Sequence, residues 1–141
     1  MKINSIISKL SDFLQSSEMF ARPSQQIPGK WDLYEYYTEN ESDLKHVKEE
    51  FLNSENLFWN MEFLDDEKYM ADSNLSLTII SSIEKGTWSI SKNFITLEHP
   101  EDSKKNVEFQ FAIEKENLKI LKKDTLGKID FFGFFRRRNS Q

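Results

Sequence analysis

The sequence predicts a mainly β fold, an antiparallel barrel or sandwich of short strands with added helices. Its 141 residues match the size of one domain, and aromatic residues make up 13% of them, with 12 Phe, unlike a disordered chain. Residues 107–113 alternate between large apolar side chains and mostly polar ones, the period of a strand with one buried face. Other short runs follow at roughly even spacing, separated by polar turns, which is typical of an antiparallel meander.

The first segment, residues 3–20, is expected to form an amphipathic helix, because Ile, Leu and Phe recur near helical spacing. Its charges cancel, whereas a helix that lies on a membrane usually carries an excess of Lys and Arg. Packing against the rest of the domain is therefore the favoured interpretation for this N-terminal helical segment, 1–22. Residues 21–28 hold two prolines and no period, which predicts a linker.

From Gly29 onward the signals are mostly β, and eight strands are predicted. They are Trp31–Thr38, Leu57–Leu64, Lys68–Ala71, Thr87–Ser91, Phe94–Glu98, Val107–Ile113, Leu118–Lys122 and Ile129–Arg137. Lys92 and Asn93 are expected to make a tight hairpin turn.

Two segments depart from the β pattern. Apolar residues in Ser42–Ser54 recur at helical spacing, which predicts a short helix between the first two strands. Residues 72–86 are apolar in the middle, and the pattern leaves a loop and an extra strand as alternatives.

Composition excludes several classes of function. The chain has no cysteine, so disulfides and cysteine-based metal or nucleophile chemistry are excluded. The net charge of −5 disfavours nucleic acid and anionic membranes, although Arg136–Arg138 is a short basic run. We find no uninterrupted apolar stretch of the kind that makes a signal peptide or a membrane-spanning helix. A cytoplasmic protein is therefore expected.

The chemistry-bearing residues predict no catalytic or metal site. His46 and His99 lack a second ligand at metal spacing, and the acidic clusters fall in predicted turns without the spacing of a calcium loop. The sequence also lacks the Gly-x-Ser-x-Gly motif of serine hydrolases. We therefore expect neither a cofactor nor an enzymatic activity.

Gly29-Lys30-Trp31 at the start of the first strand resembles the Gly-x-Trp signature of the lipocalins and the wider calycin superfamily. Those families tend to end their last strand with an Arg that packs across the Trp, and Arg136 stands at the matching place. The segment Gly86–Leu97 looks like the middle hairpin of bacterial lipocalin-like domains. The resemblance covers about residues 27–138. It implies one lipocalin-like domain, an eight-stranded up-and-down antiparallel barrel that Gly29, Trp31 and Arg136 would close.

Fatty-acid-binding proteins belong to the same superfamily and also insert helices between the first two strands. They usually hold the ligand carboxylate with an Arg-x-Tyr in a late strand. This chain has no tyrosine after Tyr69, so that motif is missing and no carboxylate site is carried over.

A barrel of eight strands is wide enough to be filled by side chains or to hold one small ligand. The favoured hypothesis is a binder of a small apolar molecule, such as a lipid. The residues expected to line its cavity are Tyr34, Tyr36, Trp59, Met61, Phe63, Tyr69, Trp88, Phe109 and Phe111. The alternative is an interaction protein with a filled barrel, whose N-terminal helix contacts a partner or a second copy in a homodimer.

Overall fold

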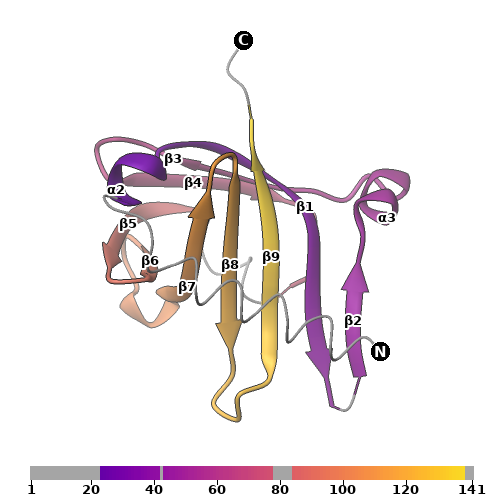
Figure 1. Cartoon of the computed structure of the whole chain (residues 1–141). Helices are drawn as coiled ribbons and strands as arrows, with labels where there is room; N and C mark the ends of the chain where they lie inside the picture. The colour runs from indigo at the N-terminus through magenta and orange to yellow at the C-terminus, as the bar shows by residue number, and fades with distance from the viewer. Residues whose placement is uncertain (1–22, 42, 78–83, 139–141) are drawn as a thin grey trace.

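A computed structural model describes residues 23–41, 43–77 and 84–138 of the chain (Figure 1). The helix predicted over residues 3–20 lies outside the described residues. The described strands are β1 (Gly29–Asn40), β2 (Asp43–Val47), β3 (Trp59–Phe63), β4 (Lys68–Ser73), β5 (Lys85–Ser91), β6 (Phe94–Glu98), β7 (Val107–Glu114), β8 (Asn117–Lys123) and β9 (Ile129–Arg137). The described helices are α2 (Pro23–Gln26), α3 (Glu49–Ser54) and the 3₁₀ helix η1 (Ser103–Lys105).

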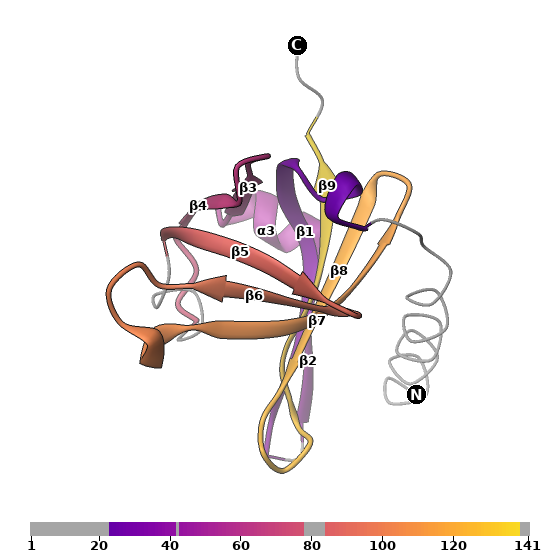
Figure 2. The ribbon, with the colours of Figure 1, turned by 90° about the vertical axis from the view of Figure 1, so that its left-hand side faces the viewer.

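These strands form one antiparallel sheet in which β3 to β9 follow one another in chain order. Pairing of β1 with β9 joins the two ends of this meander and closes an eight-stranded barrel from β1 and β3–β9. Figure 2 shows β5 and β6 crossing β1, β8 and β9 at a steep angle, as expected for a closed, strongly twisted sheet. The predicted mainly β barrel is thus confirmed.

Tight turns join several of the strands. The predicted Lys92-Asn93 turn between β5 and β6 is confirmed, and Lys92 has a positive φ of 57°. Lys115 has the same φ in the turn between β7 and β8. Positive φ in such short turns matches the twist of the flanking strands.

The helix predicted over Ser42–Ser54 is wrong in its first half, where the chain forms β2. Residues 43–47 pair with Tyr36–Asn40 of β1, and β3 pairs with the other half of the same edge of β1. Backbone pairing along this edge therefore outweighs the helical spacing of the apolar residues. The helix survives as α3, where Leu52 is 2% exposed and Phe51 is 51% exposed.

The structure also bears on the expected linker, residues 21–28, and on residues 72–86, for which a loop and a strand were alternatives. The expected linker contains the short helix α2, and Ile27 after it is fully buried. Between β4 and β5, the described residues 74–77 and 84 form no strand, and residues 78–83 lie outside the description. No helix within 23–41, 43–77 and 84–138 has the length and apolar character needed to cross a membrane.

Apolar side chains gather in two clusters, one on each face of the closed sheet. The cluster that we call the barrel core consists of Ile27, Trp31, Leu33, Tyr36, Val47, Leu52, Trp59, Met61, Phe63, Tyr69, Trp88, Ile95, Leu97, Val107, Phe109, Phe111, Ile113, Leu118, Ile120, Phe131 and Phe135. The outer cluster consists of Tyr37, Ala112, Leu121, Ile129, Phe132 and Phe134. Strand β9 therefore buries aromatic rings on both of its faces.

Candidate functional site

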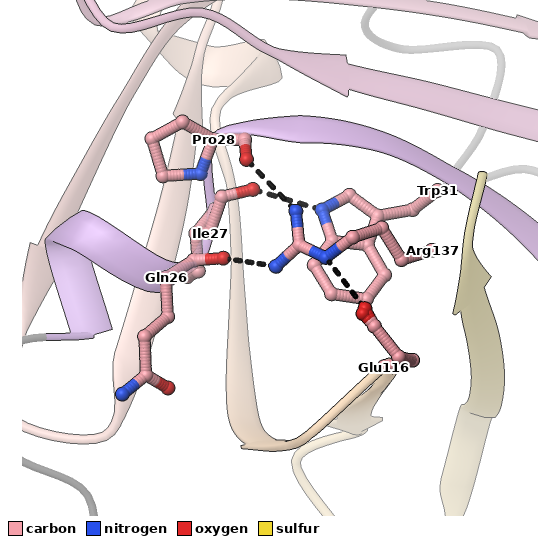
Figure 3. Close-up of polar contacts among 6 residues, drawn as sticks. All are labelled: Gln26, Ile27, Pro28, Trp31, Glu116 and Arg137. Carbon is pink, nitrogen blue, oxygen red and sulfur yellow. Dashed lines mark hydrogen bonds and ion pairs between the residues drawn. The ribbon is translucent and has the colours of Figure 1, made fainter. Parts of the chain in front are cut away.

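One end of the barrel is closed around Trp31, near the start of β1. The Trp31 side chain is fully buried, and its indole Nε1 donates a hydrogen bond to the Ile27 carbonyl at 2.8 Å. The guanidinium of Arg137 lies 4.2 Å from the centre of the Trp31 ring, in the position of a cation–π contact. Figure 3 shows the two side chains layered at this end of the barrel.

Arg137 also ties the segment before β1 to the last strand. Its Nη1 donates to the Pro28 carbonyl at 3.0 Å, and its Nη2 donates to the Gln26 carbonyl (Figure 3). Its Nε lies 3.5 Å from a carboxylate oxygen of Glu116. One charged side chain thus satisfies the carbonyl of Gln26, the last residue of α2, and that of Pro28 just beyond the helix.

Gly29 lets the chain pass close to this arginine. Its φ is +136°, and a Cβ at this position would lie 2.6 Å from Nη1 of Arg137. Both the backbone conformation and the close approach favour glycine. The role expected for Gly29 and Trp31 at the closed end is consistent with this geometry.

The closing arginine is Arg137, so the expectation of Arg136 was wrong. Trp31 is paired directly with Arg137 in the register of β1 and β9. Side chains alternate along a strand, so Arg136 points to the other face. It lies 4.3 Å over the ring of Tyr34 and makes an ion pair of 3.1 Å with Glu49.

Of the nine predicted lining residues, eight lie in the barrel core. They are Tyr36, Trp59, Met61, Phe63, Tyr69, Trp88, Phe109 and Phe111. Tyr34 does not: it packs against the outer cluster, and its hydroxyl donates to Asn117 at 3.1 Å. Tyr34 follows the core residue Leu33 and lies on the outer face by the usual alternation. An irregularity between Leu33 and Glu35 in the pairing with β9 then brings Tyr36 into the barrel core, so the two tyrosines do not share a face.

Leu33, Phe131 and Phe135 are among the interior residues that the sequence did not predict to line the cavity. The run from Phe131 to Phe135 contains four Phe around one Gly, so it shows no apolar–polar alternation from which a face could be chosen. The spacing of these residues could have identified the inner face. Phe131, Phe135 and Arg137 are an even number of positions apart, so their side chains lie on the same face of the strand.

Aromatic rings from β1, β3 and β9 meet inside the barrel. The centre of the Trp59 ring lies 5.1 Å from that of Phe131 and 5.3 Å from that of Phe135. Tyr36 stacks on Phe131 at 5.3 Å. Further along, Phe63 contacts Tyr69 at 5.2 Å. These are favourable aromatic geometries, so the interior holds two groups of contacting rings among aliphatic side chains.

The few polar atoms of the barrel core belong to tryptophan and tyrosine side chains. Trp88 Nε1 donates to the Leu64 carbonyl at 3.0 Å. Burial raises the pKa of the Tyr69 hydroxyl well above its usual value, and the nearby Trp59 indole lowers this pKa in part. The two groups do not reach hydrogen-bond geometry, however, and Trp59 Nε1 is buried without a partner in the described part of the chain. The Trp59 indole and the Tyr69 hydroxyl are therefore neighbours that are not hydrogen-bonded.

A depression of about 390 Å³ lies toward the other end of β1. It is lined by Tyr36, Thr38, Glu39, Asn40, Lys45, Leu77 and Asp130. Tyr36 belongs to both this lining and the barrel core, so it stands between the depression and the interior. The rim is polar, and Glu39 accepts a hydrogen bond from the backbone N–H of Ile129 at 3.0 Å.

Both histidines make structural contacts. His46 Nε2 lies 2.6 Å from Glu35 Oε2, and the His46 ring stacks on Tyr37 at 4.1 Å. His99 Nδ1 accepts backbone N–H groups of Glu101 and Asp102. Within the described ranges, His, Asp and Glu side chains do not gather in threes in a way that would hold a metal ion.

Comparison with known proteins gives one family match. The family model of the lipocalin-like domain matches residues 27–120, about two thirds of the chain. No curated protein and no solved structure matches the chain.

Proposed function

The chain belongs to the lipocalin-like domain family, and on this premise we propose that its barrel binds one small apolar molecule. The observation that carries the proposal is the chemistry of the interior. It is made of aromatic and aliphatic side chains, and no charged or polar residue type is buried among the described residues. Such a surface, with a few polar groups at defined places, is typical of sites for small apolar ligands.

The way in lies at the end of the barrel remote from Trp31. Strands rise about 3.3 Å per residue, so Tyr36 lies a large part of the barrel's length away from the closed end. The depression beside Tyr36 is large enough for a small molecule to enter. Lys45 of β2 borders this depression, which supports an entrance beside β2.

The close aromatic packing favours one alternative, a barrel filled by its own side chains. Trp59, Phe131 and Phe135 already lie at contact distance from one another. The protein would then act by contacting a partner or a second copy through its surface. The two functions differ in whether an apolar molecule can enter the interior.

Uptake of the fluorescent probe N-phenyl-1-naphthylamine tests the proposal. We expect saturable binding to one site, weakened by Tyr36→Ala and unchanged by the matched control Tyr34→Ala, because only Tyr36 lies in the barrel core. Native mass spectrometry of the protein as purified, with organic extraction, would identify a bound lipid or pigment. An empty protein that takes up no probe would contradict the proposal and favour the filled barrel.

A further inference from the structure

The indole N–H of Trp59 is a buried hydrogen-bond donor without an acceptor. The side chain is 2% exposed, and Nε1 has no partner within the described residues. The other two tryptophans donate to backbone carbonyls, Trp31 to Ile27 and Trp88 to Leu64. A buried donor without an acceptor costs free energy, so binding of a ligand that supplies an acceptor at this point is favoured.

The surroundings of Trp59 define what that group can be. Its ring is flanked by the rings of Phe131 and Phe135, which offer no acceptor. The neighbouring polar group is the Tyr69 hydroxyl, which is protonated at neutral pH as any tyrosine is. An indole N–H only donates, whereas a phenol hydroxyl can donate as well as accept, and the Tyr69 oxygen does not satisfy the indole in this arrangement. Together they suit an oxygen atom that accepts hydrogen bonds.

The lack of charge in the interior narrows the chemical class of the ligand further. The barrel core contains no buried charged residue among those described, so it offers no buried cation to balance a negative charge. A carboxylate would bring an unbalanced charge into an apolar interior, which is far more costly than a neutral group. A carbonyl oxygen of a ketone, aldehyde or ester supplies the acceptor without the charge.

We infer that Trp59 Nε1, next to the Tyr69 hydroxyl, anchors the carbonyl oxygen of a small neutral apolar ligand. This inference rests on the proposed function and adds to it the chemical class of the ligand. The apolar part of the molecule packs against the rings of Tyr36, Phe131 and Phe135, while its one polar atom takes the free donor.

Acetophenone and ethylbenzene test this inference, because they have similar shape and differ by a carbonyl oxygen. We expect the full chain to bind acetophenone about tenfold more tightly than ethylbenzene, the effect of one hydrogen bond to a buried donor. Trp59→Phe should abolish this preference while keeping ethylbenzene binding, and Tyr69→Phe should reduce it. Tyr34→Phe, which removes a hydroxyl outside the barrel core, serves as the control.

A second readout uses the unsubstituted protein, so it does not depend on the variants folding. The chain has 3 Trp, which give separate indole signals in a ¹⁵N–¹H spectrum. Acetophenone should move the Trp59 indole proton downfield, ethylbenzene should not, and the signals of Trp31 and Trp88 should stay because their donors are already bonded.

The outcomes separate the two proposals. If both compounds bind equally and Trp59→Phe changes nothing, the inference is overturned while apolar binding stands. If acetophenone binds but the Trp59 signal keeps its position and shows transfer from a bound water, that water satisfies the donor and the inference is also overturned. If neither compound nor the naphthylamine probe binds, the proposed function itself fails.

Discussion

Arg137 covers the buried ring of Trp31 at 4.2 Å, and these two residues face each other across the seam where β1 and β9 close the barrel. The contact combines an aromatic face with a cation whose other atoms hold backbone carbonyls. It therefore joins three parts of the molecule, the segment after α2, the first strand and the last.

Replacing Arg137 should weaken this seam. We expect Arg137→Met to lower the free energy of unfolding by about 2 kcal/mol, because it removes charged hydrogen bonds to two carbonyls and the cation–π contact. Urea unfolding measures the change. Arg136→Met is the matched control, which loses a more exposed ion pair with Glu49 and a contact over the Tyr34 ring, together worth at most about 1 kcal/mol. Equal losses in the two variants would show that Arg137 has no special role.

Gly133 is expected to be intolerant of a methyl group. A Cβ there would collide with the ring of Phe131 and lie 3.3 Å from Leu33. We expect Gly133→Ala to lower the free energy of unfolding by about 1–3 kcal/mol through overpacking. Adding Phe131→Leu should restore part of the loss, since the smaller side chain leaves the space free. Thermal unfolding of the single and double variants would decide this, and a double variant no more stable than Gly133→Ala would argue against the collision.

Leu52 should hold α3 against the barrel. It is buried in the barrel core, whereas its neighbour Phe51 is half exposed. Leu52→Ala should cost about 2–3 kcal/mol of stability, and Phe51→Ala should change it by less than about 0.5 kcal/mol. Chemical denaturation measures both. A larger effect of Phe51→Ala would mean that its exposed ring has a contact outside the described residues.

The tyrosines should make the protein less stable in strong alkali. Burial is the largest cause that raises the pKa of all 4 tyrosines, Tyr34, Tyr36, Tyr37 and Tyr69. In the unfolded chain a tyrosine titrates near pH 10. The folded state binds these protons more tightly, so their contribution is complete below about pH 10 and is lost as the pH rises through the raised values.

Two measurements check this pH dependence. The phenolate absorbance of the folded protein should develop above the pH at which it develops in the unfolded chain. The alkaline loss of stability should be smaller in Tyr69→Phe, which removes the most deeply buried of the hydroxyls. If the phenolate of the folded protein forms near pH 10, as in the unfolded chain, the tyrosine hydroxyls are accessible to water, which would contradict their burial.

Much of the barrel follows from local sequence patterns. Strand β7 was predicted from its alternation of apolar and polar residues. The turn at Lys92 was predicted from the two polar residues between two apolar runs. Strand β2 was missed, because its residues 43–47 gain their conformation by pairing with β1, and no local pattern encodes a partner strand.

The candidate site was less predictable than the strands. Eight of the nine expected lining residues have large apolar or aromatic side chains in the barrel core, which follows from their strand positions. Tyr34 was misplaced because it was expected to share a face with Tyr36, and an irregularity in β1 puts the two residues on opposite faces. The unpartnered donor of Trp59 has no signature in the chain, since it depends on what the other strands bring beside the ring.

The closing seam has a consequence for the order of events during synthesis. Arg137 bonds a carbonyl 109 positions earlier in the chain, and β1 can pair with β9 only once β9 has left the ribosome. Until then the nascent meander has two open edges and an uncovered aromatic surface, both of which favour association with other chains. Rapid closure by the last strand therefore protects the newly made protein, and variants that slow it should be seen first as a loss of yield in cells.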